Sequence, residues 1–132
     1  MTVRGLLDTS VFIAAESGRV IEVERLPDEA AMSVVTMAEL RAGVLAARDT
    51  ATRVRRMATV DALRHVEVLP VDADAAQVWA QLRVQLAEQG RRINVNDLWI
   101  AATAVSRGLP VYTQDDDFAA VEAMAGLVVV RV

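Results

Sequence analysis

Carboxylate side chains stand at four separate places in this sequence, each close to a short apolar run. Asp8 follows the first apolar run, Glu39 and Asp97 lie in the first turns of helix-like segments, and Asp115–Asp117 follow a later apolar run. In proteins that alternate strands and helices, the residues beyond the carboxyl ends of the strands share one edge of the sheet. The spacing therefore predicts that carboxylates from four segments meet at one site.

Each acid also has a purely structural interpretation. Asp8 can cap the helix that follows it, and Thr36–Glu39 and Asn94–Asp97 fit the pattern of a capping box. Asp115 can cap a last helix, with Asp116–Asp117 as its solvated first turn. For any one acid considered alone the structural interpretation is preferred, and only the convergence of several acids favours a site.

Clustered carboxylates repel one another, and a bound divalent cation removes that conflict. Ligands that are all oxygen suit Mg²⁺ or Mn²⁺ rather than Zn²⁺. Such an ion lowers the pKa of a bound water and offsets the charge of a phosphodiester, so the predicted chemistry is metal-assisted phosphodiester hydrolysis. The residues are compatible with one ion or two.

The composition narrows the chemistry further. The 132 residues include no cysteine, no lysine and a single histidine, His65, so all 14 basic residues are arginines. These counts exclude disulfides, thiolate zinc sites, Schiff-base chemistry and the lysine of a P-loop. The 18 acidic residues give a net charge of −4. A nucleic-acid substrate would therefore need local arginine clusters or a bridging cation.

Short β-rich runs alternate with helical segments, a pattern typical of a parallel sheet covered on both faces. The expected strands are Val3–Leu7, Ala31–Val35, Val66–Leu69, Val111–Thr113 and Leu127–Val132. The expected helices are Thr9–Glu16, Arg19–Leu26, Thr36–Arg48, Thr50–Arg64, Asp72–Gln89, Asn94–Arg107 and Asp116–Met124. We expect an α/β fold, a three-layer α/β/α sandwich with a mainly parallel sheet of about five strands and Rossmann-like topology, over residues 1–132 as a single domain.

Two further patterns bear on function class and location. Asp8-Thr9-Ser10 follows the first strand in place of a glycine-rich turn, which argues against a dinucleotide or nucleoside triphosphate cradle. No apolar stretch reaches the length of a membrane-spanning helix, and no export signal precedes the first strand. We expect a cytoplasmic protein with no membrane partner.

In four motifs the chain resembles the PIN-domain ribonucleases, specifically the VapC-type toxins of bacterial type II toxin–antitoxin pairs. The motifs are Leu-Leu-Asp8-Thr-Ser, Thr36-Met-Ala-Glu39-Leu, Asn96-Asp97-Leu-Trp-Ile-Ala-Ala and Thr113-Gln-Asp115-Asp-Asp117-Phe118. They occur in the family's order and span essentially the whole chain. The resemblance implies a PIN-like fold and a Mg²⁺-dependent endoribonuclease, with Mn²⁺ as a substitute ion.

The resemblance also assigns roles to the acids. It implies that Asp8 and Asp97 bind the metal, that Glu39 orients or deprotonates the attacking water, and that Asp115 completes the acidic pocket. Asp117 competes with Asp115 for that last place. Three hydroxyl residues are candidate phosphate contacts, namely Thr9, Ser10 and Thr113. The implied partners are an RNA substrate, a cognate VapB-type antitoxin and a second copy of the chain in a homodimer.

Two other functions stay open on the residues alone. The first is a non-catalytic PIN-like module that binds RNA or a protein, against which the intact acids at all four places argue. The second is another metal-dependent phosphohydrolase, such as a DNA nuclease. Side-by-side assays on RNA, DNA and nucleotides separate these functions.

Two groups of arginines are candidate contacts to RNA phosphates. Arg91–Arg92 precede the helix that carries Asp97. The second group lies on the expected helix pair after the second strand and is equally well explained as a solvated charged face: Arg41, Arg48, Arg53, Arg55, Arg56 and Arg64. Trp79 falls on an apolar helical stripe that predicts core or dimer surface, and Trp99 is expected to be a packing residue.

Overall fold

The computed structural model describes residues 1–132, in which five strands form one sheet. The strands are β1 Arg4–Leu7, β2 Glu29–Ser33, β3 Glu67–Leu69, β4 Val111–Thr113 and β5 Val129–Arg131. They lie in the order β3-β2-β1-β4-β5, and every neighbouring pair is parallel. The strand order reverses between β1 and β4, so the carboxyl ends of these two strands border the crevice in which such folds form sites.

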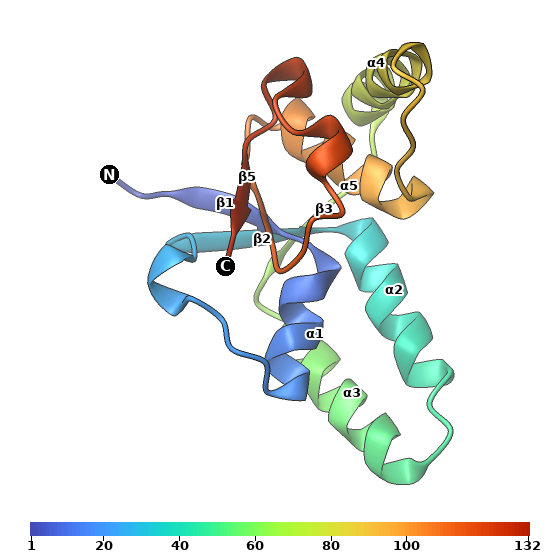
Figure 1. Ribbon diagram of the computed structural model, residues 1–132. Coiled ribbons are helices and arrows are strands. Elements are labelled where there is room, and N and C mark those ends of the chain that lie inside the picture. Colours follow the sequence, from blue (N-terminus) through green and yellow to red (C-terminus); the bar gives the residue numbers. More distant parts are fainter.

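Helices cover both faces of the sheet (Figure 1). The α-helices are α1 Thr9–Ser17, α2 Val34–Leu45, α3 Thr50–Ala62, α4 Ala73–Glu88 and α5 Val95–Ser106. In Figure 1, α1, α2 and α3 lie below the sheet, and α4 and α5 lie above it. Three short 3₁₀ turns complete the chain: η1 Val23–Arg25, η2 Ala119–Val121 and η3 Met124–Gly126. The predicted three-layer sandwich with a parallel sheet is confirmed, and no helix combines the length and apolar character needed to cross a membrane.

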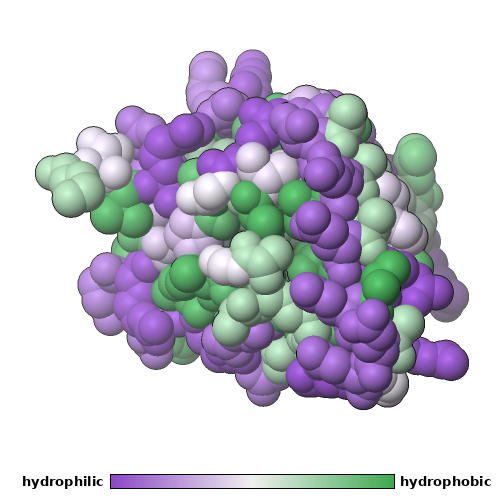
Figure 2. All heavy atoms as spheres, turned by 90° about the horizontal axis from the view of Figure 1, so that it is seen from above, coloured by the Kyte–Doolittle hydropathy of each residue, from purple (hydrophilic) through white to green (hydrophobic).

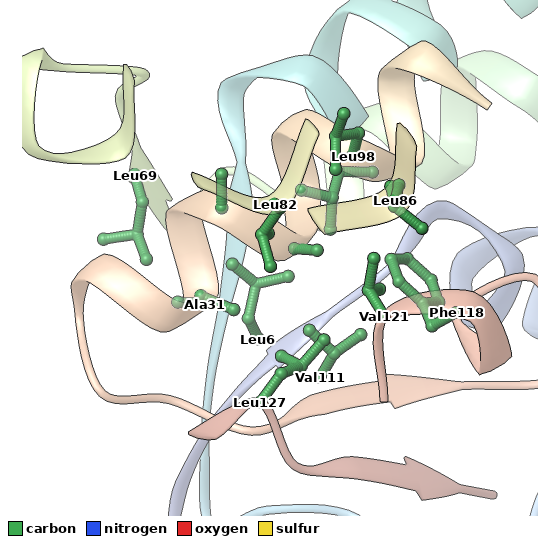
Figure 3. Close-up of a cluster of buried hydrophobic side chains, with 14 residues drawn as sticks. Leu6, Ala31, Leu69, Leu82, Leu86, Leu98, Val111, Phe118, Val121 and Leu127 are labelled. Atoms are coloured by element: carbon green, nitrogen blue, oxygen red, sulfur yellow. The ribbon is translucent and has the colours of Figure 1, made fainter. Parts of the chain in front are cut away.

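The two faces of the sheet belong to two separate hydrophobic clusters. Leu6 packs in a cluster with Leu82 of α4 and Leu98 of α5 (Figure 3). The next residue along β1, Leu7, packs with Phe12 of α1 in the other cluster. Because successive strand residues point to opposite faces, β1 is buried from both sides, which holds its carboxyl end in a fixed position.

Every α-helix begins at a residue whose side chain accepts a hydrogen bond from a backbone N–H of the first turn. These capping residues are Asp8, Ser33, Asp49, Asp72 and Asn94. The predicted capping roles of Asp8 and Asn94 are confirmed. Capping places Asp8 and the first turns of α2 and α5 at defined positions near the sheet.

The predicted boundary between the second strand and its helix is wrong. The strand ends at Ser33 rather than Val35, and the Ser33 hydroxyl accepts the N–H of Val35 at 3.0 Å, so α2 begins at Val34. Thr36 is therefore not a helix cap, and Glu39 lies in the second turn of α2, not the first. Valine favours strands, but the serine cap outweighs that preference here.

Two predicted helices are only short turns. The segment Arg19–Leu26 contains just the 3₁₀ turn η1, and Asp116–Met124 contains η2 and the start of η3. In the second segment the Asp117 N–H binds the Asp115 side chain at 3.0 Å, and Ala123 adopts a left-handed conformation (φ 69°). The left-handed conformation of Ala123 cannot be part of a right-handed α-helix, so this segment forms only short 3₁₀ turns.

Candidate active site

Asp8 lies just beyond β1 and is only 3 % exposed. Its Oδ1 accepts hydrogen bonds from the Ser10 N–H at 2.7 Å and from the Ser10 hydroxyl, and its Oδ2 accepts one from the Thr113 hydroxyl at 2.8 Å. Burial raises the pKa of Asp8, while the hydrogen bonds from Ser10 and Thr113 oppose that rise. Three donors on one buried carboxylate favour its ionised form.

The two hydroxyls that bind Asp8 are themselves oriented by the backbone after β4. The Ser10 hydroxyl oxygen accepts the Gln114 N–H at 3.0 Å, and the Thr113 hydroxyl oxygen accepts the Asp115 N–H at 3.3 Å. Each hydroxyl proton is therefore free to point at Asp8. Thr113 is fully buried and donates to Asp8, and its predicted contact with a phosphate stays a prediction. In this structure Ser10 and Thr113 hold the Asp8 carboxylate.

Glu39 projects from the second turn of α2 toward α1. The Thr9 hydroxyl lies 2.8 Å from Glu39 Oε1 and 3.0 Å from the hydroxyl oxygen of the buried Thr36. The Thr9 hydroxyl thus contacts Glu39, and its predicted contact with a phosphate stays a prediction. Sequence reasoning missed this role of Thr36, although residues three apart share one face of a helix and Thr36 stands three before Glu39.

Asp97, the third residue of α5, has its N–H directed at the capping Asn94 side chain at 3.4 Å. The pKa of Asp97 is raised to about 7, first by burial and then by the negative charges of Asp117, Asp8, Glu39 and Asp115, in that order. A side chain on α5 therefore feels carboxylates from three other segments of the chain. The structure brings the acids singled out in the sequence within electrostatic reach of one another.

The three consecutive aspartates after β4 have different surroundings. Asp115 Oδ1 lies 3.2 Å from the Thr113 hydroxyl and accepts the Asp117 N–H. Asp117 is exposed, yet partial loss of hydration and the neighbouring Asp115 and Asp116 raise its pKa. Asp116 instead forms an ion pair with Arg131 at 2.7 Å. Asp115 is thus linked to Asp8 through Thr113, whereas Asp117 has the stronger influence on Asp97.

The oxygen atoms of these carboxylates determine which cation the site can bind. No group of three or more carboxylate or histidine side chains has the spacing of a preformed metal site. Mg²⁺, however, usually keeps several waters and takes only one or two carboxylates from the protein. The charge of Asp8 contributes to the raised pKa of Asp97, and both side chains offer only oxygen atoms as ligands. The residues therefore fit a water-rich site for a hard cation and do not fit an ion enclosed by protein ligands.

Three comparisons bear on this arrangement. The family model described as "PIN domain" matches residues 5–124, a range that includes every acid of the site. The Ribonuclease VapC5 of Mycobacterium tuberculosis is 59% identical over 128 residues, which are 97% of this chain and 95% of that protein. The Ribonuclease VapC4 of the same organism is 42% identical over 117 residues, 89% of this chain and 90% of that protein.

A solved structure agrees with these relatives. The crystal structure of VapBC-5 from Mycobacterium tuberculosis, a member of the VapBC family of toxin–antitoxin systems, matches with a TM-score of 0.92 and 55% identity. The match covers 98% of this chain and 99% of that one. The similarity therefore extends over the sheet, its helices and the edge at which the acids lie.

Proposed function

This chain belongs to the PIN-domain family, in its VapC group, and from that membership we propose that it is an endoribonuclease that acts as the toxin of a toxin–antitoxin pair. The relatives named above are ribonucleases, and VapBC-5 is a toxin–antitoxin system. The observation that carries the proposal is the set of carboxylates around Asp97, whose charges contribute to a pKa of about 7. Such a cluster suits cation-assisted hydrolysis of a phosphodiester.

In the proposed mechanism the chain's own residues orient the reactants. Asp8, held as a carboxylate by Ser10 and Thr113, and Asp97 hold a hard divalent cation, Mg²⁺ or its substitute Mn²⁺. When bound, the ion acidifies a water and offsets charge on the phosphodiester. Glu39, fixed by Thr9, orients the attacking water and accepts its proton.

The contacts after β4 support Asp115 as the fourth acid of the pocket. The Asp115 N–H donates to the buried Thr113 hydroxyl oxygen at 3.3 Å, and that hydroxyl donates to Asp8. Asp117 adds negative charge on the side of Asp97. We assign the ligand role to Asp8 and Asp97 and a supporting electrostatic role to Asp115 and Asp117.

The proposed partners follow from the same relatives. RNA is the substrate, and a VapB-type antitoxin is the protein partner, as in the VapBC-5 system. We further propose that residues 1–132 act as one PIN-like domain, that the chain forms a homodimer, and that it acts in the cytoplasm, where bacterial RNA is made and translated.

The decisive experiment measures cleavage of labelled RNA by the purified protein with millimolar Mg²⁺ or Mn²⁺. Asp8→Asn removes the ligand charge with little change of shape, so cleavage should fall more than about 100-fold. A chelator should abolish it. Asp116→Asn is the matched control, because Asp116 is exposed and pairs with Arg131, and it should cleave like the wild type.

Other results of this experiment would contradict the mechanism or identify a different function. Full cleavage by a folded Asp8→Asn protein contradicts the mechanism. Equal cleavage of DNA identifies a broader metal-dependent phosphohydrolase. RNA binding without turnover at any ion concentration identifies a non-catalytic module.

A further inference from the structure

A cavity of about 570 Å³ lies outside the acidic site, where the end of α4 meets the start of α5. Trp79 and Arg83 of α4 line it on one side, and Val95 and Leu98 of α5 line it on the other. Arg91–Arg92, in the connection between the two helices, complete the wall. Figure 2 views the molecule from the side of α4 and shows hydrophilic side chains interleaved with hydrophobic ones on this face.

The three arginines of this cavity carry charges that the protein does not neutralise. Arg83, Arg91 and Arg92 are exposed, and none has an ion pair or side-chain hydrogen bond. By contrast, Arg53 and Arg56 of α3 donate to backbone carbonyls at 3.2 and 2.6 Å and so have structural roles. In a chain of net charge −4, unpaired cations gathered around one cavity favour an anionic ligand.

Trp79 adds a hydrogen-bond donor without an acceptor. Its indole N–H is buried and unpartnered, while its ring stacks on Trp99 with centroids 4.9 Å apart and planes inclined by 18°. Buried donors are nearly always satisfied in native structures, by protein, water or ligand. The predicted packing role of Trp99 is confirmed by this stack, which also fixes the position of the Trp79 ring.

The cavity lies next to the acidic site. Val95 and Leu98, which line it, flank Asp97 in the first turn of α5. Successive helical residues are turned by about 100°, so Asp97 points away from the flank occupied by Val95. The cavity and Asp97 therefore both adjoin the first turn of α5, with Val95 and Asp97 on opposite sides of it. An RNA strand that reaches the acids passes close to the cavity.

We propose that this cavity between α4 and α5 is a second RNA-binding site, which takes a phosphate and its nucleotide a short distance along the strand from the acidic site. Arg83, Arg91 and Arg92 bind the phosphate oxygens, and Trp79, held by its stack on Trp99, forms part of the wall. An acidic peptide would also neutralise the arginines. RNA is favoured because the cavity adjoins the phosphodiester-cleaving acids, and the inference rests on the proposed ribonuclease function in this respect.

The test measures binding of a fluorescent single-stranded RNA of mixed sequence by anisotropy, in the presence of a chelator so that no cleavage occurs. The double variant Arg91→Ala/Arg92→Ala should bind at least about 5-fold more weakly. Its slope of log affinity against log salt should be shallower by about 0.7 for each phosphate that the variant no longer binds.

The matched control is Arg48→Ala/Arg64→Ala. It removes the same charge from two exposed arginines that have no ion pair or side-chain hydrogen bond, at either end of the α3 segment. This variant should bind RNA with nearly wild-type affinity. The lysine variant Arg91→Lys/Arg92→Lys should keep the wild-type salt slope. Equal melting temperatures of all variants exclude unfolding as the cause of weaker binding.

Several results overturn the inference. These are no RNA binding by the wild type, equal weakening in both alanine pairs, or unchanged RNA binding by Arg91→Ala/Arg92→Ala with loss of a protein partner instead. The last result identifies the cavity as a protein interface. Because binding is measured without metal, unchanged binding by this variant together with Asp8-dependent cleavage rejects the cavity and leaves the ribonuclease function intact.

Discussion

The hydroxyl of Thr113 is the contact between β4 and the carboxylate at the end of β1. It is fully buried, donates to Asp8 Oδ2 at 2.8 Å and lies 3.2 Å from Asp115. A side chain that donates a hydrogen bond to a metal-binding carboxylate fixes the orientation of that carboxylate. Its replacement commonly changes metal affinity or activity. Thr113 is therefore a positioning residue for Asp8.

Thr113→Val tests that role, since it replaces the hydroxyl by a methyl group of similar size. The buried Asp8 carboxylate loses one donor, so its pKa should rise further. The variant should unfold about 1–3 kcal/mol more easily and cleave RNA about 10–100-fold more slowly. Thermal melting and cleavage rates measure both effects. Thr113→Ser should restore them, and wild-type cleavage by the valine variant would rule out the positioning role.

Asp97 gives the metal-free protein a specific pH dependence. Its ordinary pKa of 3.8 applies to the unfolded chain, and its pKa of about 7 applies to the folded one. Between these values the folded state holds a proton that the unfolded state lacks, so this group's contribution to stability decreases as pH rises through about 4 to 7. Above that range the charged carboxylate destabilises the fold.

Asp97→Asn removes this charge and should stabilise the chelator-treated protein at about pH 8 by ~1–2 kcal/mol, a value reduced by the partial exposure of Asp97. Near pH 3.5, where most of the unfolded-state carboxyl is protonated, the difference should largely disappear. Urea unfolding at both pH values provides the measurement. A stability difference that is the same at both pH values would show that the pKa of Asp97 is not raised in the folded protein.

Among the elements, β1 is closely packed because both its faces are covered. At Gly5 a Cβ atom would overlap the ring of Tyr112 on β4. Gly43 of α2 is different, since the nearest atom to an added Cβ is Arg56 Cδ at 3.9 Å. The same substitution should therefore have opposite effects at the two positions.

Gly5→Ala should destabilise the protein by about 1–3 kcal/mol through overpacking. Gly43→Ala should stabilise it by about 0.5–1 kcal/mol, because alanine is the better helix former. Denaturant midpoints of the two variants against the wild type measure the effects. A destabilised Gly43→Ala protein would mean that the contact of Arg56 with the end of α2 is too close to admit a methyl group.

In the molecule as a whole, the acids come from the residues that follow β1 and β4 and from α2 and α5, so their repulsion opposes the assembly of all these elements. A cation that binds only the folded state should stabilise it by mass action, by about 2.7 kcal/mol at a concentration 100 times its Kd. Chelator-stripped protein should therefore melt at a higher temperature in millimolar Mg²⁺ or Mn²⁺. Asp8→Asn/Asp97→Asn should show almost none of this increase. An equal increase in the double variant would place the ion elsewhere.

The features that depend on a few neighbouring residues could be predicted from the sequence. Short-range patterns account for the helix caps at Asp8 and Asn94 and for the order of strands and helices. They also account for the packing of Leu6 and Leu7 on opposite faces of the sheet. The start of α2 differs from its predicted place because Val34 has a strand preference that the Ser33 cap overrides. The helix predicted over Asp116–Met124 is replaced by short turns because Ala123 adopts a left-handed conformation that an α-helix cannot contain.

The chain order of residue types was enough to establish a parallel α/β fold and to single out the acids. The partners of those acids required the folded chain. Thr9 meets Glu39 across 30 positions and Thr113 meets Asp8 across 105, and the unpaired arginines face a cavity that exists only once α4 and α5 are docked. Short-range patterns arise from backbone conformation and capping within one or two turns, whereas the distance between remote side chains is set by how whole elements pack.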